Sequence, residues 1–237
     1  NIYQPDGVLG LLKTLDDRET IRPYAMATFR EILHASAKSP AMLVYLDNVS
    51  NTRNGGNENY ARELMELHTL GVDGGYDQTD VEQVALCFTG WTVTPKRSDD
   101  RFRFHFNARR HAPGPKTVLG ETIHFPDDPI REGERVLDLL ADHPSTARFI
   151  SGKLCRTFVS DQPPDALVER VAGAFSNSGG DIRLTLAEIF ASSEFRDSAD
   201  QKFRRPIDYV AAALRVSDVD PGEREWRAIA KGLEALG

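Results

Sequence analysis

Apolar residues recur at helical spacing among polar ones in segment 57–71, NENYARELMELHTLG. Successive side chains of an α-helix are rotated by about 100°, and this spacing predicts one amphipathic helix across the segment. The apolar stripe of that helix contains Tyr60, Leu64, Leu67 and Leu70, and Glu63 falls within it. A carboxylate that enters a core costs several kcal/mol unless it is paired, hydrogen-bonded or protonated. We therefore expect Glu63 to have a charged partner, a proton or a functional role.

Two interpretations of Glu63 are open from the sequence. As a structural carboxylate it would pair with an arginine, for which Arg148 and Arg205 are candidates, or with the amides of a helix N-terminus. Alternatively it serves catalysis or binds a ligand. Glu66 and His68 point about 200° apart on a regular helix, so these two do not form a metal site alone. The face that we expect to be solvated carries Glu58, Arg62, Met65 and Glu66.

Helical periodicity recurs along the chain. It predicts a first core helix at 21–37, and the capping box at Thr79 starts a helix that ends at Gly90. Further helices are predicted at 130–142, from His143-Pro144, after Pro163-Pro164, after Asp181, from Arg205-Pro206 and at 223–236. No low-complexity tract, internal repeat or boundary separates them. We expect a single helical domain over residues 1–237.

Between residues 101 and 125 the period changes from about 3.6 to about 2. Phenylalanines alternate with polar residues in FRFHF (102–106), and TVLGETIHF (117–125) can return as a second strand. The pattern predicts a β-hairpin. In its connecting segment, HAPGPK, two prolines and a glycine fix the backbone between His111 and Lys116, and rigid loops that present polar residues often carry function.

These elements predict a mainly α fold, a multi-helix orthogonal bundle with one β-hairpin inserted at about 101–125. The two cysteines, Cys87 and Cys155, both fall within predicted amphipathic helices. They are interpreted as buried small apolar residues, with a disulfide between them as the alternative.

Charge argues against a nucleic-acid partner. The chain has 36 acidic and 29 basic residues, a net charge of −7, and no long cluster of lysine and arginine. No apolar run approaches the roughly 18 residues needed to span a bilayer, so no direct membrane span is expected.

The candidate chemistry is dispersed along the sequence. Acid–base catalysis draws on histidine and on buried carboxylates, which makes Glu63, His68, His111 and His143 the catalytic candidates. The binding candidates are Glu66, Lys116 and Arg148. Each histidine also has a structural interpretation; His68 can cap the end of its helix, and His143 can be an N-cap before Pro144. Common nucleotide-binding, serine-hydrolase and zinc-peptidase motifs are absent, while a metal held by distant Glu and His residues stays open and no cofactor is indicated.

Several ordered motifs resemble one bacterial family. They are NENYARELMELHTLGV, FTGWTV, HAPGPKTVLG, HPSTARFISGKL, SGGDIR, SSEF and KFRRPIDYV, and they resemble the domain-of-unknown-function family numbered eighteen hundred in its series. Its members are longer, so the chain is similar to their C-terminal half. The family loop that usually reads His-Asp here reads His111-Ala112; if that aspartate orients the histidine in relatives, the orienting group is missing in this chain.

The resemblance implies a cellular setting rather than a reaction. Family members commonly carry an export signal upstream, which implies a periplasmic or secreted location, and they are often encoded beside a sulfatase-like protein that becomes a candidate partner. We expect a structural or interaction domain of the cell envelope that acts with a partner protein. The alternative is an enzyme with an acid–base or metal site built from Glu63, His68, His111 and His143. The sequence does not indicate an oligomeric state.

Overall fold

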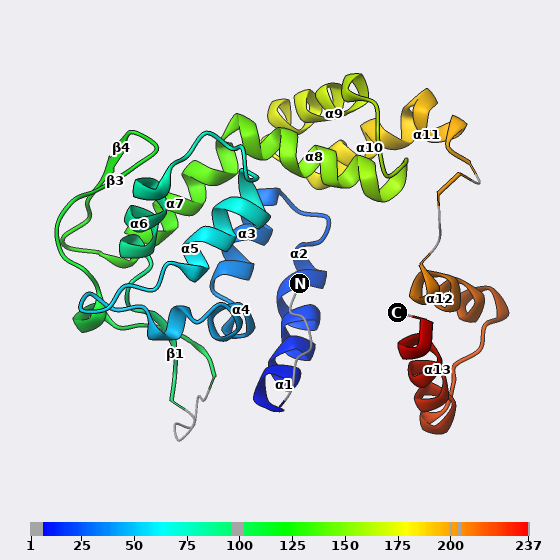
Figure 1. Cartoon of the computed structure of the whole chain (residues 1–237), viewed down its shortest axis with the longest axis horizontal. Helices are drawn as coiled ribbons and strands as arrows, with labels where there is room; N and C mark the ends of the chain where they lie inside the picture. The colour runs from blue at the N-terminus through cyan, green and yellow to red at the C-terminus, as the bar shows by residue number, and fades with distance from the viewer. Residues whose placement is uncertain (1–6, 96–101, 200, 203–204, 237) are drawn as a thin grey trace.

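The computed structural model describes residues 7–95, 102–199, 201–202 and 205–236. It is mainly α-helical with two short antiparallel strand pairs (Figure 1), which confirms the predicted fold class. The first elements are α1 (Gly7–Leu15), η1 (Asp16–Ile21), α2 (Arg22–Tyr24), α3 (Phe29–Ala37), α4 (Pro40–Tyr45), η2 (Asn48–Ser50), α5 (Asn59–Glu63), η3 (Leu64–Thr69), α6 (Gln78–Cys87), β1 (Trp91–Val93) and β2 (Phe104–Phe106). The others are η4 (Ala108–Arg110), β3 (Lys116–Val118), β4 (Glu121–Ile123), α7 (Ile130–Asp142), α8 (Pro144–Phe158), α9 (Asp165–Asn177), α10 (Ile182–Ala191), α11 (Ser193–Asp197), α12 (Pro206–Ser217) and α13 (Glu223–Leu236).

The apolar core has a larger and a smaller part. The larger part gathers side chains of α3 to α7 and the strands around fully buried Leu43, Phe88 and Trp91. The smaller part joins α8, α9 and α10 around Cys155, Leu167 and Ile189. In Figure 1, α8 leads away from the first group of helices toward the second. The predicted candidates therefore come from elements that pack mostly in the larger part.

The segment predicted as one regular helix changes its hydrogen-bond pattern at its centre. After α5 the chain continues as the π-helix η3, in which an N–H bonds to the C=O five residues earlier; the amide of Leu70 donates to the carbonyl of Met65 at 2.8 Å. The prediction for two residues is consequently wrong. Met65 is fully buried instead of solvated, and Leu67 is 45% exposed instead of buried. The other apolar members of the predicted stripe are buried.

Strands β2, β3 and β4 lie within the predicted segment 101–125, but β1 lies before it and the strands pair differently from the prediction. The phenylalanine-rich β2 pairs with β1, and β3 pairs with β4. The turn between β3 and β4 is Leu119-Gly120, and both residues have positive φ, 49° and 78°. Such a two-residue turn matches the twist of adjacent strands, so β3 closes on its immediate neighbour. Residue 101, at the edge of the predicted hairpin, lies outside the described residues.

Helix limits follow the capping residues. The predicted helices at 130–142 and 223–236 agree with α7 and α13. The predicted helix at 21–37 is interrupted, because Thr28 forms a capping box with Glu31 and starts α3 anew. Helix α6 starts earlier than predicted, because Asp77 rather than Thr79 is its N-cap, accepting a hydrogen bond from the amide of Asp80 at 3.0 Å.

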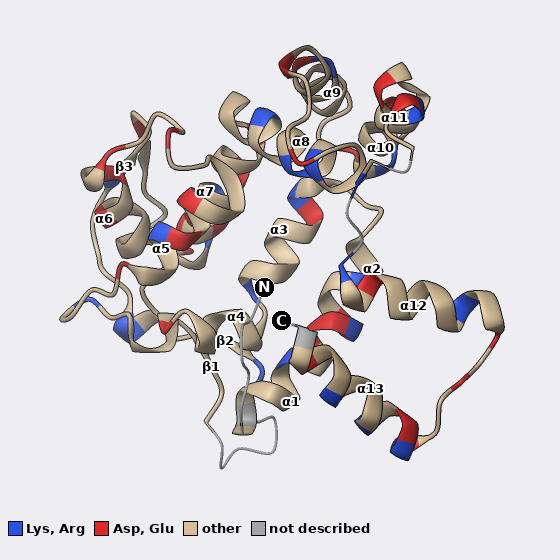
Figure 2. Ribbon diagram, turned by 45° about the vertical axis from the view of Figure 1, so that its right-hand side comes forward, with Lys and Arg blue, Asp and Glu red and all other residues tan. Residues whose placement is uncertain are grey.

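The last two helices differ from the rest of the fold. No described residue of α12 or α13 is buried, and Tyr209 and Val216 are 65% and 90% exposed. Figure 1 shows the pair beside each other and apart from α8 to α11. Figure 2 shows acidic and basic positions intermixed along α13. The pair therefore contributes little to the core that positions the candidate residues.

Cys87 and Cys155 are both buried and unbridged, which confirms their interpretation as small apolar residues. Burial, with a smaller contribution from the charge of Glu132, raises the pKa of the Cys87 thiol to about 12. Separately, no helix within the described part of the chain is long and apolar enough to cross a membrane.

Candidate functional site

The structure places the predicted site residues other than Glu66 in three separate regions. Glu63 and His68 line one pocket. His111 and Lys116 belong to a buried cluster of ionisable groups. His143 and Arg148 lie at the start of α8. The four catalytic candidates therefore do not converge, and only the first two share a surface that a ligand can reach.

The π-helix brings Glu63 and His68 to the same pocket. They are five residues apart, a spacing that separates two side chains by about 140° on a regular α-helix. Where the backbone bonds from i to i+5 instead, residues at this spacing stack on one face. Gly71, with φ of 83°, ends this segment against the ring of Phe149, which lies 2.8 Å from where a Cβ would be. The packing at Gly71 leaves no room for a side chain.

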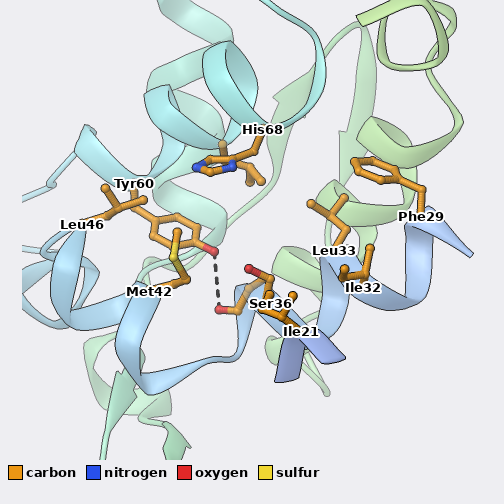
Figure 3. A pocket seen from close by; sticks show the side chains of 11 residues that line it. Ile21, Phe29, Ile32, Leu33, Ser36, Met42, Leu46, Tyr60 and His68 are labelled. Atoms are coloured by element: carbon orange, nitrogen blue, oxygen red, sulfur yellow. Dashed lines mark hydrogen bonds between the residues drawn. The ribbon is translucent and has the colours of Figure 1, made fainter. Parts of the chain in front are cut away.

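His68 lines an apolar cavity of about 160 Å³. In Figure 3, His68 of η3 and Tyr60 of α5 lie opposite Ile32 and Leu33 of α3. The Tyr60 hydroxyl donates to the carbonyl of Ala37 at 3.4 Å, and burial raises the pKa of Tyr60. Apart from His68, the polar side chains among the lining residues are Tyr60 and Ser36. The cavity therefore suits an apolar group.

His68 also lines a polar pocket of about 640 Å³. Its lining residues are Tyr45, Leu46, Asn59, Glu63, Leu67, His68 and Lys153. Leu46 and His68 line both spaces, so they form the boundary between the apolar cavity and the polar pocket. We call the two spaces together the Glu63–His68 site. It combines an apolar volume and charged groups, and the His68 imidazole lines both.

The His68 imidazole is neutral at pH 7. Desolvation by burial is the main cause that lowers the pKa of His68 from 6.5 to about 4, and the positive charge of Lys153 is a minor one. A neutral imidazole has one nitrogen that donates and one that accepts a hydrogen bond. His68 therefore supplies polarity to the boundary without adding a positive charge beside Glu63.

Glu63 is half-buried and has no hydrogen bond or ion pair with any described residue. Its two predicted arginine partners pair elsewhere, so that part of the prediction is wrong. Arg148 pairs with Glu169 and, at 3.6 Å, with Asp165. Arg205 binds Asp208 at 2.7 Å. The carboxylate that the sequence singled out thus faces the polar pocket without a partner.

Lys153, by contrast, has contacts within the site. Its ammonium donates to the carbonyl of Leu67 at 2.6 Å and lies 4.4 Å from the centre of the Phe149 ring. Asn59 donates through its amide to the carbonyl of Leu46 at 3.2 Å. The remaining charge without a described partner in the polar pocket is Glu63.

His111, Lys116 and Glu132 form a second polar group, the buried ionic cluster. Lys116 Nζ lies 2.5 Å from Glu132 Oε2, and His111 Nε2 lies 3.0 Å from the same oxygen. Lys116 also donates to the carbonyl of Ala112 at 2.5 Å. Lys116 and Glu132 are each 2% exposed, and His111 is 6% exposed. The charges of the cluster are therefore enclosed by protein and paired with one another.

Backbone groups complete the hydrogen bonding of the cluster. His111 Nδ1 lies 2.8 Å from the carbonyl oxygen of Thr89; because a carbonyl oxygen only accepts, Nδ1 carries the proton. The Thr89 hydroxyl accepts from the amide of Ala112 at 2.8 Å. The second oxygen of Glu132 accepts from the amide of Phe125 at 3.2 Å. The cluster thus joins the end of α6, the loop before β3 and the segment after β4 to α7.

The remaining candidates have local roles. The His143 side chain is the N-cap of α8 and accepts from the amide of Ser145 at 3.2 Å, as its structural interpretation predicted. Glu66 lines neither part of the Glu63–His68 site; after desolvation, its charge is the next cause of the raised pKa of Tyr76. Within the described residues, no group of three or more His, Cys, Asp or Glu side chains is placed to hold a metal ion.

A family model described as "Protein of unknown function (DUF1800)" matches residues 1–237. The chain belongs to the DUF1800 family. No curated protein and no solved structure matches it. The family match confirms the resemblance seen in the motifs and leaves the function to be argued from the site.

In this DUF1800 chain, sequence reasoning missed several residues that build the two polar regions. Asn59, Tyr45 and Lys153 reach the polar pocket from three helices, and no local pattern connects them. The burial of Glu132 could have been predicted from the sequence, because it precedes Val136 and Leu140 at the four-residue spacing of a buried helical stripe. The helical spacing that placed Glu63 on an apolar stripe thus also places Glu132 on one.

Proposed function

We propose that this domain is a non-catalytic binding domain, and that the Glu63–His68 site binds a small amphipathic molecule. The observation that carries this proposal is the shared boundary at Leu46 and His68 between an apolar cavity and a polar pocket. A ligand with an apolar group and a polar head fits this division. It differs from the role expected from the sequence, in which the domain acts with a partner protein.

The volume of the apolar cavity supports a small ligand. An apolar cavity of about 150 Å³ is large enough to bind benzene, and the apolar cavity here is of that size. Ligand sites usually combine apolar walls with a few polar groups that orient the ligand. His68, Glu63 and Lys153 are such groups at this site.

The acid–base enzyme is the less supported alternative. An efficient general base at neutral pH has a pKa near 7, whereas the pKa of His68 is lowered to about 4. His111 hydrogen-bonds within a buried ionic cluster and His143 caps a helix, so neither adds a catalytic group beside Glu63. Binding therefore accounts for the geometry better than proton transfer does.

The family resemblance supports two further proposals about setting. They are a periplasmic or secreted location and action beside a sulfatase-like partner protein. Both rest on the resemblance to the family.

Binding can be tested with benzyl alcohol, a neutral molecule that has a ring and a polar head. We expect saturable binding by calorimetry and a rise in Tm. At a ligand concentration of about ten times Kd, the expected stabilisation is about 1.4 kcal/mol. Ser36→Leu places a larger side chain at the wall of the apolar cavity and is expected to abolish binding.

The matched control is Ser176→Leu, which makes the same change on an exposed position of α9. It should bind benzyl alcohol as the unmodified protein does. Binding of benzyl alcohol that survives Ser36→Leu would contradict the proposal, as would failure of the unmodified protein to bind any of benzyl alcohol, benzylamine and benzoate.

A further inference from the structure

The charge balance of the Glu63–His68 site indicates what head group it accepts. Glu63 has no described partner, while the ammonium of Lys153 already contacts the carbonyl of Leu67 and the Phe149 ring. His68 is neutral at pH 7 because its pKa is lowered to about 4. The unsatisfied requirement of the site is therefore a positively charged donor for the Glu63 carboxylate.

A bound cation would offset the cost of the partly buried carboxylate. Removing a charged group from water is unfavourable unless an opposite charge or hydrogen-bond donors replace the lost hydration. An ammonium supplies three N–H donors and a positive charge. Tyr45 and Asn59 also line the polar pocket, and each carries a side-chain oxygen of the type that accepts hydrogen bonds. The lining thus complements an ammonium more fully than a carboxylate.

The apolar cavity limits the rest of the ligand. Its volume of about 160 Å³ matches one six-membered ring or a short branched chain. The ligand must place that group past His68 while its head stays with Glu63 on the polar side.

We propose that the Glu63–His68 site takes a protonated primary amine that carries one small aromatic or branched aliphatic group. This inference rests on the proposed binding function and names its ligand class. Glu63 binds the ammonium, the apolar cavity encloses the ring or chain, and the neutral His68 lies between them. The unpaired Glu63 is thereby a ligand-binding residue rather than a structural one.

The test compares three probes of the same size, benzylamine, benzyl alcohol and benzoate, by calorimetry at pH 7. Benzylamine is expected to bind at least tenfold more tightly than benzyl alcohol, and benzoate more weakly than both. Glu63→Gln should remove the tenfold preference for benzylamine while the affinity for benzyl alcohol stays within about threefold.

Glu66→Gln is the control, because it removes a carboxylate from the same helical segment without touching the lining of the site. It should leave all three affinities unchanged. A preference for benzoate, or a benzylamine preference that persists in Glu63→Gln, overturns the ligand class while the binding site itself stands. Failure of all three probes overturns both the ligand class and the proposed function.

Discussion

The Glu63–His68 site and the buried ionic cluster each combine a carboxylate with an imidazole, but their surroundings are opposite. In the cluster, Glu132 contacts both His111 and Lys116 within 3.0 Å and is 2% exposed. At the site, Glu63 is half-buried, has no described partner and lines a pocket of about 640 Å³. The residue types are the same. The carboxylate of the cluster has partners within the protein, whereas the carboxylate of the site has none among the described residues.

The difference separates structure from binding. A buried charge whose partners are all supplied by the protein has no capacity left for a ligand, and removing one partner leaves the others uncompensated. A carboxylate beside a pocket without such partners can gain them from a ligand. The comparison predicts large stability effects at the cluster and small ones at the site.

The largest effect is expected for Glu132→Gln. The amide has no negative charge to offset Lys116, so a buried ammonium loses its ion pair. Removal of one partner from a buried pair typically costs about 3 to 5 kcal/mol, and we expect about 3 kcal/mol in the free energy of unfolding measured with urea.

The same substitution at an exposed pair is the control. Glu121→Gln breaks the ion pair with Arg135 at 2.7 Å, in which both side chains are more than a third exposed, and should cost less than about 1 kcal/mol. If Glu132→Gln fails to fold, the double variant Lys116→Met with Glu132→Met removes both charges and is expected to recover a folded protein. Equal costs for Glu132→Gln and Glu121→Gln would refute the structural role of the cluster.

An intermediate effect is expected from pH at His68. The pKa of His68 is lowered to about 4 in the folded protein, while the unfolded chain has the ordinary value of about 6.5. As pH falls from 6.5 to 4 the unfolded state takes up the proton first, so stability is lost over this range and is fully present above it. After allowance for partial solvent exposure, the loss is on the order of 2 kcal/mol.

The measurement is urea unfolding of the unmodified protein and His68→Gln at several pH values. The difference between their stabilities should change between pH 6.5 and 4 and be constant above pH 7. Titration of the imidazole by NMR gives a direct second measure, and a midpoint above pH 6 would contradict the burial of this ring.

The smallest effect on stability is expected for Glu63→Gln. Since Glu63 has no described partner to lose, the free energy of unfolding of the protein should change by less than about 0.5 kcal/mol. The contrast with Glu132→Gln is then between two identical substitutions. A loss of several kcal/mol at Glu63 would show that it is a structural carboxylate after all.

The sequence predicted the helices where local signals are strong. Helix α7 and helix α13 agree with their predicted limits, and His143 caps α8 as one interpretation proposed. The strand pairing and the partners of Glu63 were not predictable in this way. The sequence pattern did not distinguish pairing of β2 with β1 from pairing with a later segment. Arg148 and Arg205, the predicted partners of Glu63, instead bind acidic residues near them in the sequence or the fold.

The amino-acid pattern by itself determined the mainly α class, the caps and the presence of a carboxylate on an otherwise apolar helix, because these depend on residues a few positions apart. Only the tertiary structure decided that this helix becomes a π-helix at Leu64, with Gly71 packed against Phe149. That change of register rotated His68 toward Glu63 and buried Met65. Its hydrogen-bond pattern is uncommon in isolated helices, so packing against other elements, rather than local propensity, selects it.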